Sequence, residues 1–119
     1  MGEHANYITV PMLTEGVRQA AAWGADAIQS HCAALTGPLE SLMGDERLSI
    51  APATQRVAHI LGIRLSDPAG IAAIMSELEA RRVRISQRGR SIRISPHVYN
   101  GPADIDALME GLGAGLETR

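Results

Sequence analysis

The sequence predicts an α+β fold, with a small antiparallel sheet of about three or four strands, helices on one face of it, and two linking helices before it. From Leu48 onward, alternating and helical hydrophobic patterns follow in the order strand, strand, helix, strand, strand, helix. Residues 11–43 show only helical spacing. We therefore expect a loop and interdomain helices over residues 1–46 and a small C-terminal domain over residues 47–119, within one compact unit.

The N-terminal region is expected to form two helices that meet at Gly24. Pro11 suits the first turn of one helix, and Asp26 suits the N-terminus of the next. Gly37-Pro38 should kink or break the second helix. Its apolar stripe would be exposed without a partner and would favour self-association; the stripe consists of Ile28, Leu35, Leu39 and Leu42.

The strongest strand signal runs from Val57 to Leu65 and places His59 on the same face as Leu61 and Ile63. Asp67-Pro68 then begins a helix that continues to about Ala80. Two further strands, 83–87 and 91–95, are expected to form a hairpin closed at Gly89. The last helix begins at Pro102, and glycines 111, 113 and 115 are expected to fray its end.

The segment from Arg90 to Asp106 predicts a strand, a polar corner and a helix start. Arg93 lies between Ile92 and Ile94, so it faces away from the core, and Pro96 ends the strand. A guanidinium held there can bind a carboxylate or phosphate, although a plain surface arginine has the same pattern. His97 follows at the corner, where it either contacts the same ligand or makes a structural hydrogen bond.

The composition narrows the chemistry of the chain. All 11 basic residues are arginine, so a lysine-linked cofactor cannot form within these 119 residues. The net charge of −2 gives no argument for nucleic acid, although six arginines lie from Arg81 to Arg93. Short apolar runs and no visible signal peptide argue against membrane insertion. The single Cys32 fits a packed thiol in a reducing, cytoplasmic compartment.

Three segments resemble the class V aminotransferase family, which comprises fold type I enzymes dependent on pyridoxal phosphate (PLP). Ile92-Arg93-Ile94-Ser95-Pro96-His97-Val98-Tyr99-Asn100, followed by Pro102-Ala103-Asp104-Ile105-Asp106, resembles the C-terminal signature of the family. Gly2-Glu3-His4-Ala5-Asn6 resembles the loop before its interdomain helices, and Trp23-Gly24-Ala25-Asp26-Ala27-Ile28 resembles their junction. The family includes cysteine desulfurases, selenocysteine lyases, kynureninases and isopenicillin-N epimerase-like proteins.

The resemblance implies that the chain is the small domain of a longer, dimeric transferase or lyase acting on an amino acid. Arg93 would bind the substrate α-carboxylate, with His97 beside it, whereas His4 and Asn6 would lie near the cofactor phosphate. PLP itself would be held by a large domain outside this chain, so the chain alone should be inactive. The tight Arg88-Gly89-Arg90 hairpin replaces a longer cysteine-bearing loop, which argues against sulfur abstraction.

Two other functions remain open on the sequence. Residues 48–116 have an element order that stand-alone domains binding or sensing amino acids also use. Alternatively, the helices of residues 11–43 could dock on a partner in an assembly domain. Within the resembling family, transamination, epimerisation and lyase chemistry all remain open.

Overall fold

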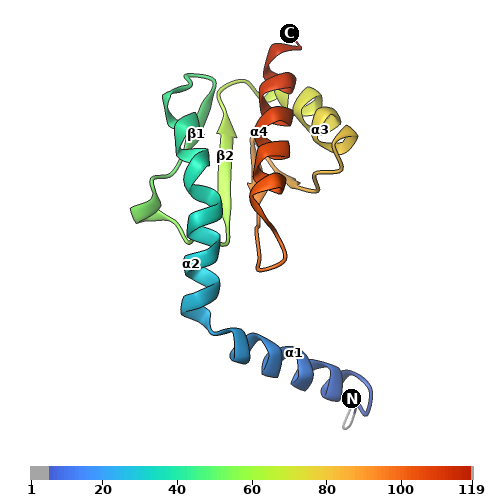
Figure 1. Cartoon of the computed structure of the whole chain (residues 1–119). Helices are drawn as coiled ribbons and strands as arrows, with labels where there is room; N and C mark the ends of the chain where they lie inside the picture. The colour runs from blue at the N-terminus through green and yellow to red at the C-terminus, as the bar shows by residue number, and fades with distance from the viewer. Residues whose placement is uncertain (1–5, 119) are drawn as a thin grey trace.

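A computed structural model describes residues 6–118, and in that part the chain forms four α-helices and one four-stranded antiparallel sheet (Figure 1). The predicted α+β class is therefore confirmed. The helices are α1 (Thr9–Trp23), α2 (Ala25–Thr36), α3 (Ile71–Ala80) and α4 (Pro102–Glu117). The strands are β1 (Leu48–Ile50), β2 (Leu61–Leu65), β3 (Ser86–Arg88) and β4 (Ser91–Ile94), and the 3-10 segments are η1 (Gly37–Gly44), η2 (Ala53–Gln55) and η3 (Pro68–Gly70).

The sheet has the strand order β1-β2-β4-β3 and buries one face. Ile63 of β2 lies at the centre, paired with Ile50 on one side and Ile92 on the other. Helices α2, α3 and α4, together with η1, contribute to the same core, through Leu35, Leu39, Ile74, Leu78, Leu108 and Leu112. These helices therefore cover the apolar face, and the opposite face carries the alternate residues of each strand.

The second linking helix belongs to the compact body, which corrects one prediction. Leu35 and Leu39 are buried in the core and are not an exposed stripe, because they pack on the apolar face of β1 and β2. The helix changes at the predicted position: α2 ends at Thr36, and Pro38 lies in the first turn of η1. A proline at that place lacks the N–H that would continue the α-helical bonding.

Helix α1, in contrast, has no buried residue and extends away from the sheet (Figure 1). Gly24 separates it from α2 with a φ of 81°, a conformation that favours glycine. Seven large apolar side chains of this region are exposed: Tyr7, Ile8, Val10, Met12, Leu13, Val17 and Trp23. The exposed apolar surface predicted for α2 thus lies on α1.

Strand β2 is shorter than predicted, since pairing begins at Leu61 and not at Val57. Its two neighbours limit it: pairing with β4 ends at Ile94, and β1 ends at Ile50. Pro96 and Pro52 follow these ends and cannot donate ladder hydrogen bonds. The placement of His59 on the buried face was wrong, because His59 lies outside the strand and is exposed.

The hairpin has the predicted tight turn, with its first strand shifted. Arg88 pairs with Ser91, and Gly89 between them has a φ of 58°. Strand β3 covers 86–88, whereas Val83 and Ile85 pack against the core outside the ladder. The expected strand over 83–87 therefore began too early and ended one residue too early, since the strand that forms is Ser86–Arg88.

The prediction that glycines fray the end of α4 was wrong, and two of them instead let the helix approach α3 closely. Helix α4 continues to Glu117, and Gly111 and Gly115 are buried. A Cβ built on Gly115 would lie 2.5 Å from Cα of Ile74, and one on Gly111 would collide with the side chain of Leu78. Gly113, on another side of the helix, would meet nothing within 4 Å.

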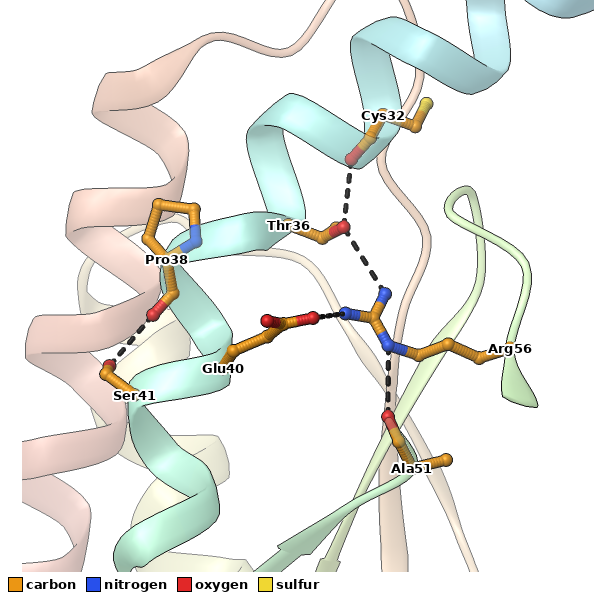
Figure 2. Close-up of polar contacts among 7 residues, drawn as sticks. All are labelled: Cys32, Thr36, Pro38, Glu40, Ser41, Ala51 and Arg56. Carbon is orange, nitrogen blue, oxygen red and sulfur yellow. Dashed lines mark hydrogen bonds and ion pairs between the residues drawn. The ribbon is translucent and has the colours of Figure 1, made fainter. Parts of the chain in front are cut away.

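Arg56 ties the segment between β1 and β2 to the end of α2 (Figure 2). Its Nε donates to Ala51 O at 3.1 Å, Nη1 donates to Thr36 Oγ1 at 3.4 Å, and Nη2 lies 3.3 Å from Glu40 Oε1. Thr36 is itself buried and donates to Cys32 O at 2.9 Å. This arginine has a structural role and no free hydrogen-bonding fork.

Candidate functional site

Arg93 lies on β4, one of the two central strands, and faces the side of the sheet opposite the helices. Its partners across the ladder are Gly62 on β2 and Ser86 on β3. The side chain is half-buried, and its Nε is fully buried without a hydrogen-bond partner among residues 6–118. A buried donor without an acceptor is unusual. No ion pair holds the guanidinium within residues 6–118, and an acceptor from outside the chain would have to reach its Nη groups, because Nε is covered by the chain itself.

The corner after β4 is fixed by Asn100 and Asp104. Asn100 Oδ1 accepts from the backbone N–H of His97 at 3.0 Å, and its Nδ2 donates to Asp104 Oδ2 at 3.1 Å. The same carboxylate oxygen accepts from Gly101 N at 3.0 Å. The Gly101 N–H, followed by the Asn100 amide, lowers the pKa of Asp104 below its usual value. Asn100 therefore fixes the corner through both ends of its side-chain amide.

His97 is held by stacking and not by a hydrogen bond from its ring. Its ring centroid lies 5.5 Å from that of Tyr99 and 5.8 Å from that of Trp23. In the described part of the chain, its buried Nδ1 has no hydrogen-bond partner. Of the two interpretations of His97, a structural hydrogen bond from the side chain is therefore not what the structure shows. A ligand contact stays a prediction.

Helix α2 supports the corner from the other side, which the sequence patterns did not reveal. His31 Nε2 lies 3.1 Å from Asn100 O, and Cys32 Sγ donates to Pro96 O at 3.5 Å. Burial raises the pKa of the Cys32 thiol, as expected for a packed residue and not for a nucleophile. The aromatic support from Trp23 was also missed, because no local pattern connects residues so distant in sequence.

His4 and Asn6 are the two residues predicted to approach the cofactor, and the structure describes only Asn6. His4 lies outside the described residues. Asn6 caps α1, since its Oδ1 accepts from Ile8 N at 3.2 Å and Thr9 N at 2.7 Å. It lies at the end of α1 that points away from the sheet (Figure 1). The cofactor contact of Asn6 therefore stays a prediction, and the structure does not bring it to the corner.

A hollow of about 470 Å³ lies between the segment before β3, the end of β4 and the start of α4. It is lined on one side by Arg82 and Arg84 and on the other by Tyr99 and Asp104. Neither Arg93 nor His97 lines it. This hollow is therefore distinct from the predicted substrate site.

No protein-family model matches the chain, and a comparison with curated proteins finds no match. Within residues 6–118, no three acidic, histidine or cysteine side chains are grouped so that they could hold a metal ion. In the same residues, no helix has both the length and the apolar character needed to cross a membrane.

Proposed function

We propose that this chain is the C-terminal small domain of a PLP-dependent enzyme of the class V aminotransferase type and that it binds the α-carboxylate of an amino-acid substrate. The observation that carries the proposal is the position of Arg93 on the uncovered face of the sheet, without an ion-pair partner among residues 6–118. The strand, corner and helix around it, from Ser91 to Glu117, match the order that the resemblance predicted. The antiparallel sheet with helices on one face agrees with this domain type.

A carboxylate is the acceptor that suits Arg93 best. Its two oxygens can accept in parallel from the two Nη groups of the planar fork. Gly62, directly across the ladder, adds no side chain beside the guanidinium, and a Cβ there would meet nothing within 4 Å. Space for a ligand therefore exists on this face.

The cofactor would belong to a large domain outside this chain. PLP supplies an electron sink for the carbanion that forms at the substrate α-carbon. The chain has no lysine, so none of its side chains can bind PLP covalently. Its own contribution would be to orient the substrate carboxylate. The exposed apolar side chains of α1 would pack on the large domain or on the second subunit of a homodimer.

The proposal is tested by the coding sequence upstream of Met1 and by activity of the two parts together. We expect a lysine-bearing PLP domain there, and we expect turnover of an amino acid when both parts are present. Arg93→Lys should raise the KM by about tenfold or more, because a point charge replaces a bidentate fork. Arg82→Lys, at an exposed arginine outside the sheet, is the matched control and should leave the KM unchanged.

The alternative is a stand-alone amino-acid-binding domain, and it predicts a different result. Such a domain would bind an amino acid tightly and saturably on its own, with loss of binding in Arg93→Ala. The small domain of an enzyme would bind only weakly until the large domain closes the site. Tight binding by this chain alone, without any PLP domain upstream, would therefore overturn the proposed enzyme function.

A further inference from the structure

The uncovered face of the sheet carries only three types of residue. Strand alternation and the ladder register place seven residues there, which we call the arginine face: Ser49, Gly62, Arg64, Ser86, Arg88, Ser91 and Arg93. Each is serine, glycine or arginine, and none is acidic. The arginine face therefore carries only positive charge, and Arg64 and Arg88 are exposed on it while Arg93 is half-buried.

The register places two further arginines next to Arg93. Ser91 pairs with Arg64 on one side and with Arg88 on the other, and Arg93 lies one row further along β4. Both arginines are therefore diagonal neighbours of Arg93, at about 7–8 Å between backbone positions. This spacing suits two acid groups separated by a short carbon chain, each bound by a different guanidinium.

The arginines of this face are not neutralised by acidic residues of the described chain, a property they share with Arg82, Arg84 and Arg90. Each of four other arginines has an acidic partner: Arg18, Arg47, Arg56 and Arg81. Among the described residues, Arg64, Arg88 and Arg93 make no ion pair and no side-chain hydrogen bond. Three unpaired like charges repel one another, so a bound ligand with more than one negative charge would stabilise this face.

Of the two neighbours of Arg93, Arg88 is better placed than Arg64 to bind a second acid group. Arg64 lines a separate hollow of about 310 Å³ together with Glu46, which can compete for its guanidinium. Arg88 has Ser91 opposite it, and the nearby Gln87 amide is occupied by Gly89 O at 3.1 Å. The guanidinium of Arg88 therefore faces no acid on its own strand or on β4.

We infer that the substrate has two acid groups, with the α-carboxylate on Arg93 and the side-chain acid on Arg88. The class of substrate is thus an acidic amino acid, and this inference rests on the proposed function of Arg93. Loss of Arg88 should remove the preference for the second acid group and leave binding of the first intact. Arg64 carries the same charge on the same face. Its substitution therefore distinguishes a specific contact of Arg88 with the ligand from a general electrostatic effect.

The test compares L-glutamate with L-glutamine, two ligands of nearly equal size that differ by one acid group. Binding is followed through the Nε–H signal of Arg93 in nitrogen-15 NMR spectra of the whole chain at neutral pH. We expect L-glutamate to bind about fivefold more tightly, which corresponds to one surface ion pair. This preference should vanish in Arg88→Gln and persist in Arg64→Gln.

Each other outcome contradicts a defined part of the account. Equal affinity for both ligands in the unmodified chain would overturn the inference and leave the role of Arg93 standing. An equal loss of preference in Arg64→Gln and Arg88→Gln would also overturn it, because it would show a general charge effect. No change of the Arg93 signal with either ligand would instead overturn the proposed function itself.

Discussion

At the scale of single residues, the sequence predicts the roles of side chains that depend on neighbouring residues. It misses contacts between residues that are distant in sequence. The outward direction of Arg93 follows from strand alternation, and the capping role of Asp67 follows from the proline after it, with Ala69 N donating to its carboxylate at 2.9 Å. The contacts of Trp23 and His31 with the corner depend on how α2 crosses the end of the sheet. No spacing within the sequence encodes that crossing.

Asp104 gives a prediction about pH at this scale. Its pKa is lowered in the folded chain by the Gly101 N–H and the Asn100 amide. Its stabilising effect is therefore present above the unfolded pKa of about 4 and is lost as the pH falls through the folded pKa. In Asp104→Ala, the melting temperature should drop at pH 7, and the gap from the unmodified chain should narrow at pH 3.

The control for Asp104 is Asp106→Ala, which removes an acid from the same helical turn. Asp106 lies outside the hydrogen bonds that fix the corner, so its removal should lower the melting temperature less. Thermal unfolding followed by circular dichroism measures both variants. A gap for Asp104→Ala that stays constant from pH 7 to pH 3 would contradict the role assigned to its carboxylate.

At the scale of elements, helix and strand identities were predictable, whereas their ends and contacts depended on neighbours. The start of α4 at Pro102 agrees with the local signal. Strand β2 was predicted too long because the lengths of β1 and β4 limit its pairing. The glycines of α4 were misread because helix propensity describes an isolated helix, and Gly111 and Gly115 are buried against α3.

The close contact of α3 and α4 leads to a matched pair of substitutions. Gly115→Ala should destabilise the chain by about 1–3 kcal/mol, because the added methyl group meets the backbone of Ile74, which cannot move aside. Gly113→Ala places the same methyl group in open space and should stabilise by up to about 1 kcal/mol. Urea unfolding measures both, and equal effects of the two variants would contradict this packing.

At the scale of the whole molecule, the α+β class follows from the order of hydrophobic patterns, but the exposed surface does not. The patterns of α1 and α2 are both helical, and only the structure shows that α2 joins the core while α1 does not. Gly24, with a φ of 81°, lies at the junction from which α1 extends away from the sheet (Figure 1). The largest group of exposed apolar side chains named for the described residues is therefore on and just before α1.

The exposed α1 predicts that the chain self-associates when that partner is absent. Leu13 and Val17 are 67% and 59% exposed and lie on one side of the helix. Leu13→Glu should shift the chain toward monomer in sedimentation velocity at high concentration. Gln19→Glu adds the same charge away from this side and is the control; an unmodified chain that stays monomeric would contradict the prediction.

The most direct test of the central claim is a calorimetric titration of the chain with L-alanine, which offers one carboxylate and little else. We expect weak saturable binding that falls about tenfold or more in Arg93→Gln, because a charged hydrogen-bond pair is lost. Arg93→Lys should not restore it, and Arg64→Gln should bind as the unmodified chain does. Equal binding by the unmodified chain and Arg93→Gln would contradict the assignment of Arg93 as the carboxylate ligand.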